Sequence, residues 1–154
     1  MPENISDHIT YDESVHSDKA VELHLNNVPG SLQITAMKLL ASRVFEPLRA
    51  YMNEPITVDS FYRNIAVNRA VGGVDTSQHV KGEAIDIKCP GKNLIMFDWI
   101  KANLDFDQLI REFGTDQAPA WIHVSFKAFG NRKQAYKSKS ITVKGKTTTK
   151  YTSV

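Results

Sequence analysis

The ten residues SQHVKGEAID, numbers 77 to 86, join a polar loop to a short strand and decide how this part of the chain folds. Side chains alternate between the two faces of a strand, so Ile85 is expected in the core and Asp86 on the opposite face. His79 lies in the loop just before the strand. Gly82 marks the bend, because a residue without a side chain lets the loop fold back until His79 and Asp86 converge. The stretch therefore brings an imidazole and a carboxylate to one side of a sheet.

A second strand, predicted over residues 121–127, carries another histidine in the same way. Alternation places Ile122 and Val124 on one face, and His123 and Ser125 on the other. The sequence thus offers a second imidazole that points away from the apolar side of the sheet.

Two neutral imidazoles and one carboxylate form a ligand set that suits Zn²⁺. Three protein ligands leave the fourth position open for water, as catalytic zinc requires, whereas structural zinc takes four. Such a site favours hydrolysis of an amide bond. A His followed seven residues later by an Asp is common in proteins, so the spacing of His79 and Asp86 alone does not establish a metal site.

The rest of the chain predicts an α+β domain, a small and mainly antiparallel sheet packed against helices. Apolar residues recur at three- and four-residue steps from Leu32 to Met52, which predicts the longest helix, with Ser31 as its N-cap. Pro47 should bend or interrupt its last turns. Shorter helices are predicted over residues 65–71 and 94–103, and strands over 56–58 (running into 60–63), 83–88, 106–113 and 121–127.

Composition limits the kind of site and the number of domains. The chain has 154 residues, enough for one good core, and its single cysteine, Cys89, excludes an intrachain disulfide and a cysteine-rich zinc site. No apolar run approaches the roughly 20 residues that cross a bilayer, and no export signal is visible. We expect a monomer with one catalytic domain, residues 1–127.

The charge is uneven along the chain, since residues 128–154 carry seven basic residues and no acid. This segment is rich in Lys, Ser and Thr and is predicted to be a basic tail. It could bind anionic cell-wall polymers, or it could be a solvated and partly disordered end. It lacks the interleaved aromatic residues of a nucleic-acid-binding segment, so nucleic acid is not expected as a partner.

Four motifs together resemble one family. Residues 77–86 read as S-x-H-x-x-G-x-A-x-D and residues 121–125 as W-x-H-x-S, while VDSFYR at 58–63 resembles V-x-S-G-Y-R and DQLIRE at 107–112 matches D-Q-L-I-x-E. The chain is thereby similar, from about residue 8 to 127, to the zinc D-Ala-D-Ala carboxypeptidases and related phage cell-wall peptidases, which share a fold with the Hedgehog signalling domain. The resemblance implies this Hedgehog/DD-peptidase fold.

The resemblance also implies roles for individual residues. His79, Asp86 and His123 would bind zinc, and Arg63 would hold a substrate carboxylate or steady charge on the attacked carbonyl. Ser77, Trp121 and Ser125, which belong to the two motifs, would contact substrate. The chain departs from the family at Phe61, where glycine is usual and where a large side chain could reshape the floor near Arg63.

A second departure is Ala120, because many relatives place an acidic general base there. Residues 106–113 and 121–127 are consecutive and should pair as a hairpin, which would bring Glu112 near His123. We therefore expect Glu112 to act as the general base, with Asp116 as the next candidate. The alternative is that Glu112 orients a histidine ligand by accepting its other ring proton.

The expected function is hydrolysis of peptidoglycan stem peptides, by a carboxypeptidase or by an endopeptidase of the endolysin kind. The enzyme would be made in the cytoplasm and reach the cell wall through a holin or by virion delivery. An alternative is a non-catalytic, zinc-bound wall-binding module of the same fold, which Ala120 favours.

Overall fold

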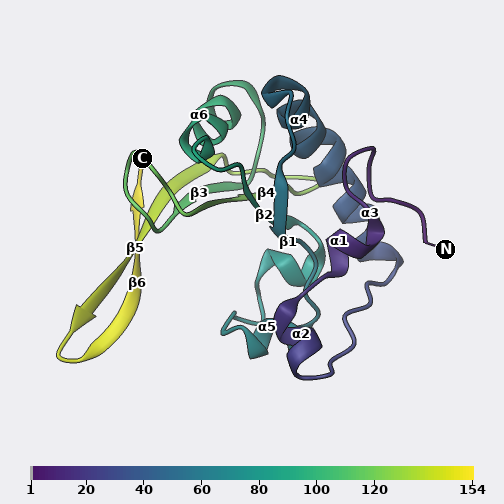
Figure 1. The fold of residues 1–154 in the computed structure, drawn as a ribbon, viewed down its shortest axis with the longest axis horizontal. Coiled ribbons are helices and arrows are strands. Elements are labelled where there is room, and N and C mark those ends of the chain that lie inside the picture. The colour runs from purple at the N-terminus through teal and green to yellow at the C-terminus, as the bar shows by residue number, and fades with distance from the viewer. Residues whose placement is uncertain (1) are drawn as a thin grey trace.

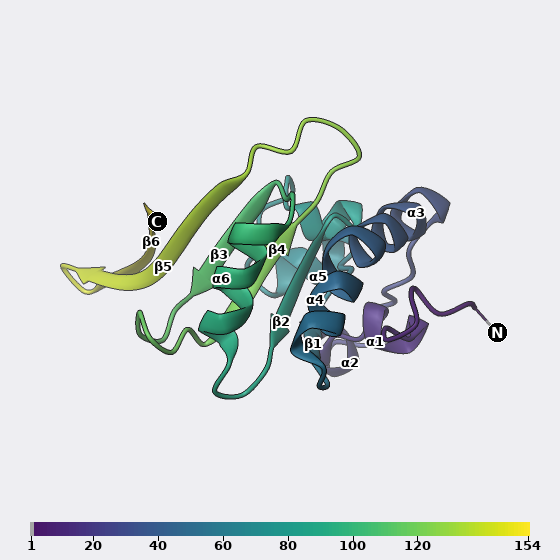
Figure 2. The same ribbon diagram turned by 90° about the horizontal axis from the view of Figure 1, so that it is seen from above.

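The computed structural model describes residues 2–154, which form one six-stranded sheet with helices packed against it (Figures 1 and 2). The strand order is β1-β2-β4-β3-β5-β6, and every neighbouring pair is antiparallel except β3 with β5. The strands are β1 (Thr57–Ser60), β2 (Ala84–Lys88), β3 (Gln108–Glu112), β4 (Trp121–Ser125), β5 (Gln134–Val143) and β6 (Lys146–Ser153). The predicted α+β class with a mainly antiparallel sheet is confirmed.

The helices supply the other half of the core. They are α1 (Tyr11–Val15), α2 (Asp18–Glu22), α3 (Ser31–Leu40), α4 (Glu46–Met52), α5 (Ile65–Ala70) and α6 (Asn93–Asn103), with a π-helix over Ala41–Phe45 and a 3₁₀ turn over Gln78–Lys81. Figure 2 shows α6 lying across the sheet beside α4. Ile85, Ile87, Ile122 and Val124 are wholly buried on this covered face. The predicted alternation in both strands therefore holds. No helix among residues 2–154 has the length and apolarity that a membrane crossing demands.

The helix predicted from residue 32 to 52 is interrupted where proline requires it. Pro47 lies in the first turn of α4, directly after the π-helical turn Ala41–Phe45. Because proline has no N–H, it cannot continue the hydrogen-bond ladder of α3, and the wider π turn accommodates the gap. The predicted cap is wrong by one residue: the N-cap is Gly30, whose N–H donates to the Gln33 side chain at 3.0 Å.

Most of the segment predicted as a basic tail, residues 128–154, forms strands, so its alternative interpretation as a partly disordered end does not hold for residues 134–153. Residues 134–153 form the β5–β6 hairpin, and β5 pairs along its first half with β3. The Lys, Ser and Thr residues that resembled a low-complexity tail alternate in a strand pattern, and pairing of β5 with β3 and with β6 satisfies their backbone hydrogen bonds. The chain after residue 127 thus adds two further strands to the same sheet.

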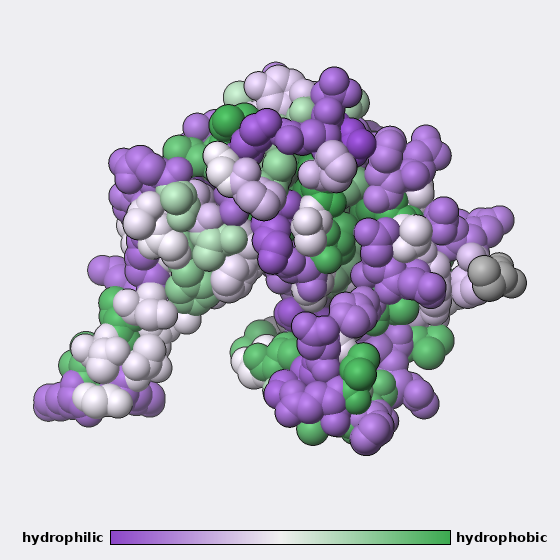
Figure 3. All heavy atoms as spheres, viewed as in Figure 1, coloured by the Kyte–Doolittle hydropathy of each residue, from purple (hydrophilic) through white to green (hydrophobic). Residues whose placement is uncertain are grey.

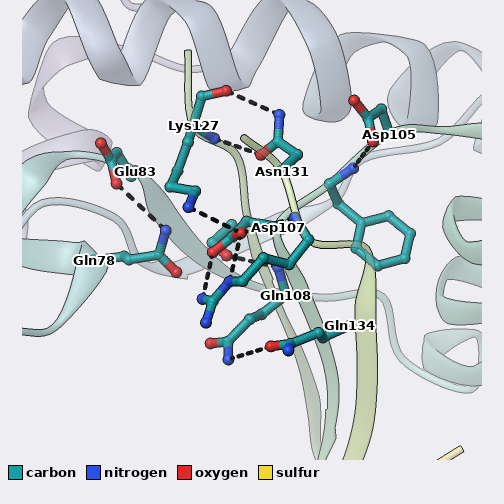
Figure 4. Close-up of polar contacts among 11 residues, drawn as sticks. Gln78, Glu83, Asp105, Asp107, Gln108, Lys127, Asn131 and Gln134 are labelled. Carbon is teal, nitrogen blue, oxygen red and sulfur yellow. Dashed lines mark hydrogen bonds and ion pairs between the residues drawn. The ribbon is translucent and has the colours of Figure 1, made fainter. Parts of the chain in front are cut away.

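A buried carboxylate ties the start of β5 to β3. Asp107 is wholly buried, and its side chain accepts hydrogen bonds from the backbone N–H of Arg132 at 3.0 Å and from the Arg132 guanidinium at 2.9 and 2.7 Å. Lys127 approaches the same carboxylate at 3.4 Å, as Figure 4 shows. The hydrogen bonds from Arg132 lower the pKa of Asp107 to about 2. The connection that leads into the hairpin is therefore held by charge-assisted bonds.

Asp107→Asn should destabilise the protein by about 2 kcal/mol at pH 7, because the pKa of Asp107 falls from 3.8 to about 2 on folding. A lowered carboxyl pKa contributes stability above about pH 4, and this contribution is lost as the pH falls towards 2. Urea unfolding at several pH values should therefore show a shallower loss of stability below pH 4 for the variant than for the wild type.

Asp105→Asn is the matched control, since Asp105 is exposed and two residues away. Its stability should stay within about 0.5 kcal/mol of the wild type. Equal stability of Asp107→Asn and wild type at pH 7 would contradict a stabilising role for the Asp107–Arg132 ion pair.

Candidate metal centre

Strand register brings two of the predicted ligands together. In the antiparallel pair of β2 and β4, Asp86 lies directly opposite His123, and Ser60 of β1 lies opposite Asp86 on the other side. Residues directly opposite in such a pair point to the same face. Here it is the face opposite α4 and α6. The Nδ1 atom of His123 is 2.9 Å from an oxygen of Asp86.

His79 joins this pair from the 3₁₀ turn before β2. Its Nε2 atom lies 3.3 Å from the second oxygen of Asp86, and its ring centroid is 5.3 Å from that of His123. One donor atom from each of the three residues lies within 4.8 Å of the other two. The predicted convergence of His79, Asp86 and His123 is thus present in the structure.

Gly82 permits this approach for two reasons. Its φ of +73° is in the left-handed region, and a Cβ atom there would lie 2.5 Å from the backbone oxygen of Gln33 in α3. Any side chain would push the turn away from α3. Since the same turn carries His79, the close packing of Gly82 on α3 sets the position of the first histidine.

The backbone of Phe61 orients His79. The Nδ1 atom of His79 is 2.7 Å from the Phe61 carbonyl oxygen, which only accepts, so Nδ1 carries the proton and Nε2 is left as a donor atom for a metal. The expectation that the Phe61 side chain reshapes the floor near Arg63 is wrong. This side chain is wholly buried in the core, because alternation along the chain turns it away from the open face.

The charge states of His79 and Asp86 suit a metal, whereas His123 must release a proton before it can bind one. Burial lowers the pKa of His79 and so favours its neutral form. Burial alone would raise the pKa of Asp86, but the two histidines beside it outweigh burial and hold the pKa well below its usual range. For His123, burial opposes protonation, while the hydrogen bond and charge of Asp86 outweigh it and raise the pKa. A carboxylate that is charged and two imidazoles turned towards it form the donor set that zinc prefers.

Arg63 lies beside this centre and is held in place by neutral groups. Its Nε donates to the Asn68 side chain and its Nη1 to the Ser60 hydroxyl, each at 3.1 Å. Asn27 supports the segment from the far side, donating to the Tyr62 carbonyl at 2.9 Å and accepting from the Asn64 N–H at 2.8 Å. No carboxylate pairs with Arg63 among the described residues, so its charge is available to a substrate.

The predicted hairpin of β3 and β4 is confirmed, and it brings Glu112 to the same face. Glu112 lies opposite Trp121, two residues from His123. It is buried, 8% exposed, and accepts a hydrogen bond of 2.5 Å from the Ser138 hydroxyl in β5. Burial raises the pKa of Glu112. Within residues 2–154, no hydrogen bond joins Glu112 to a ring nitrogen of either histidine.

Asp116, the second candidate base, lies elsewhere. It is exposed in the β3–β4 loop and pairs with Lys137 at 3.3 Å, on the face of the sheet opposite the metal ligands. It does not line the cavity described below. The β3–β4 loop turns over the far face of β3 and so carries Asp116 away from the candidate metal ligands. Asp116 is therefore excluded as the general base.

The centre lies in the floor of a cleft with a volume of about 1110 Å³. The loop after α5 and the turn with Ser77 line one side, and Trp121 and the β5–β6 hairpin line the other. Figure 3 shows this hollow as a wide opening between the hairpin and the lobe formed by α2 and α5. Ser77 and Trp121, which were predicted to contact substrate, both line this cleft. Ser125 is wholly buried outside the lining, where its hydroxyl accepts from the Gln108 N–H at 2.9 Å.

The sequence interpretation missed two tyrosines of the cleft wall, Tyr136 and Tyr151, and the buried Ser138 that donates to Glu112. All three come from the segment that was read as a tail. The signal that could have found them is the strict alternation YKSKS from residue 136 to 140, which is typical of a strand with two different faces. Compositional bias in the segment concealed that pattern.

Comparison with known proteins agrees with the extent of the predicted resemblance. A family model described as Peptidase M15 matches residues 7–125. The comparison with curated proteins finds no significant match.

The purified protein should hold about one zinc ion per chain, and alanine in place of His79, Asp86 or His123 should remove most of it, since each would leave only two protein ligands. Metal analysis after gel filtration measures this. His16→Ala is the control, because His16 is an exposed histidine that pairs with Asp18. A variant of any of the three that keeps full zinc occupancy would exclude that residue as a ligand.

Proposed function

The chain belongs to the peptidase M15 family, and we propose that it is a zinc endopeptidase that cuts the stem peptides of bacterial peptidoglycan. The observation that carries this proposal is the convergence of two histidines and an aspartate in the floor of an open cleft that also contains a buried glutamate. Zinc bound there would supply a water-derived nucleophile at neutral pH and polarise the scissile carbonyl.

Glu112 is proposed as the general base. It lines the cleft close to His123, and its raised pKa suits a group that takes a proton from the attacking water and gives it to the departing amine. The hydrogen bond from Ser138 holds one of its oxygens and leaves the other for this exchange. The absence of a hydrogen bond to a histidine ring, within the described residues, favours this role over that of an orienting partner.

Arg63 is proposed to stabilise the charge that develops on the attacked carbonyl. Ser60 and Asn68 hold its guanidinium before substrate arrives, so little reorganisation is needed during the reaction. Ser77 and Trp121 line the cleft on opposite sides of the metal ligands and are proposed to contact the peptide.

The shape of the cleft favours an endopeptidase over a carboxypeptidase. A carboxypeptidase needs a closed end that stops the chain one residue beyond the scissile bond. Here the lining extends from Val71 and Gly72 on one side of the metal ligands to Tyr136 and Tyr151 on the other. A cleft that extends to both sides of the metal ligands supports binding of a peptide that continues on both sides of the scissile bond.

The second candidate is a non-catalytic zinc-bound module, which the alanine at position 120 favours. Mass analysis of purified peptidoglycan fragments distinguishes the two. We expect the protein to release new peptide termini and a chelator to abolish their release. Glu112→Gln should lower turnover by about a hundredfold or more at saturating zinc, because the proton acceptor is lost.

Asp116→Asn is the control for the glutamate variant, since Asp116 is an acid on the opposite face of the sheet. Its turnover should equal that of the wild type. A wild-type protein that holds zinc and yields no new termini would support the module instead, and near-normal turnover of Glu112→Gln would exclude Glu112 as the base.

The lysine residues of the β5–β6 hairpin are proposed to bind anionic wall polymers. Lys137 and Lys139 pair with Asp116, whereas Lys144, Lys146 and Lys150 are exposed and have no ion pair within residues 2–154. Three cations close together on a projecting hairpin suit a polyanion.

Replacing Lys144, Lys146 and Lys150 together by serine should reduce co-sedimentation with cell walls at low salt. Exposed charges are screened over about 10 Å at 0.1 M, so the difference from the wild type should vanish at high salt. Lys101→Ser, on the exposed side of α6, controls for the loss of a surface lysine. Unchanged sedimentation of the triple variant at low salt would show that the lysines have no such role.

A further inference from the structure

The β5–β6 hairpin has two faces of different chemistry. Its register pairs Tyr136 with Ser153, Ser138 with Tyr151, Ser140 with Thr149 and Thr142 with Thr147, so these eight residues share one face. Every one of them carries a hydroxyl group. The other face holds Lys137, Lys139, Lys146 and Lys150 together with Ile141, Val143, Thr148 and Thr152.

The hydroxyl face, meaning those eight residues, is the one that continues the cleft. Tyr136 and Tyr151 line the same cavity as His79, Asp86 and His123, and no residue of the lysine face does. In Figure 1 the hairpin projects from the body on the opposite side of the opening from α5, and Figure 3 shows the hollow between them.

Strand register relates this face directly to the candidate catalytic residues. One row across the sheet runs from Trp121 through Glu112 and Ser138 to Tyr151. The next row runs from Asp86 and His123 through Ile110 to Tyr136. A substrate chain that runs from the metal centre across the strands therefore reaches the hydroxyl face next.

The chemistry of this face selects an uncharged partner rich in hydrogen-bonding groups. It has no cation to attract a carboxylate and no acid to attract an amine, although four lysines lie one residue away on the other side. Hydroxyl groups both donate and accept, and a tyrosine ring adds an apolar surface with a polar end. Tyr151 is 55% exposed and free to offer its ring.

Peptidoglycan offers two polymers to such a surface. The stem peptides carry free carboxylates, whereas the sugar chain is uncharged and presents hydroxyl and acetamido groups. The seven residues from Tyr136 to Thr142 extend over about 20 Å, long enough for several sugar units. We propose that the hydroxyl face binds the sugar chain of peptidoglycan next to the peptide that is cut, an inference that rests on the proposed function.

The test uses the zinc-loaded full chain and a soluble oligomer of β-1,4-linked N-acetylglucosamine as the probe. Amide chemical shifts should move in residues 136–142 and 147–153, and calorimetry gives the affinity. Tyr151→Ala and Thr149→Ala should weaken binding, the tyrosine variant by about fivefold, as expected for one aromatic contact. Tyr151→Phe, which keeps the aromatic ring, should lose less affinity for the oligomer than Tyr151→Ala does.

Thr148→Ala is the matched control, because Thr148 is an exposed threonine of the same strand on the opposite face. Thr148→Ala removes the same side-chain atoms as Thr149→Ala and lowers the strand propensity by the same amount. Its affinity for the sugar oligomer should equal that of the wild type. Because Thr149 is also exposed, the Thr149→Ala variant keeps the test valid even if Tyr151→Ala disturbs the hairpin.

The proposal would be overturned if the sugar probe caused no chemical-shift change in the hydroxyl face. It would also be overturned if Thr148→Ala and Thr149→Ala lost equal affinity for the probe, or if a sugar-free stem peptide alone shifted the resonances of the hydroxyl face. Hydrolysis of the sugar-free stem peptide is measured on the same samples. An active protein that does not bind the sugar rejects this inference alone, and one that binds sugar without hydrolysis rejects the peptidase.

Discussion

The pairing of β2 with β4 places Asp86 opposite His123, and the other parts of the cleft are arranged around that pair. A slip of one residue between these strands would turn Asp86 or His123 into the core and bring Ile85 or Ile122 out. The helices on the covered face prevent such a slip, because they bury Ile85, Ile87, Ile122 and Val124 completely. The geometry of the metal ligands is therefore maintained by the hydrophobic core on the other side of the same strands.

The polar side of the sheet concentrates charges that would be costly to bury alone. Taking an ion out of water costs several kcal/mol unless it is paired. Asp86 contacts both histidines, and Glu112 accepts a hydrogen bond from Ser138. The charge of Arg63 lies against neutral partners instead. Within residues 2–154, the cation Arg63 therefore has no protein counterion and lies beside three residues suited to a metal, an arrangement that favours binding of a polar substrate.

The C-terminal hairpin makes the site larger than the part of the chain that matches the family. The match ends at residue 125, yet Ser138 donates to Glu112 and two tyrosines line the cleft. Asp107 and Arg132 hold the start of β5 against β3, so the hairpin is joined to the sheet by charge-assisted bonds as well as by its backbone. The two faces of this hairpin differ in chemistry, so the two proposed partners, a polyanion and an uncharged polymer, would bind on opposite faces.

The sequence by itself predicted the convergence of the three candidate metal ligands, because strand alternation and a glycine at the bend are local properties that leave His79, Asp86 and His123 on one face. It also determined the α+β class and the pairing of Glu112 with the strand of His123, since consecutive strands with a short loop form hairpins. The tertiary structure decided what depends on contacts between distant residues. It sends Phe61 to the core and Asp116 to the far face, and it buries Ser125 outside the cleft lining. It also converts an apparent tail into two strands, because the edge of β3 supplies the hydrogen bonds that residues 134–138 could not make alone.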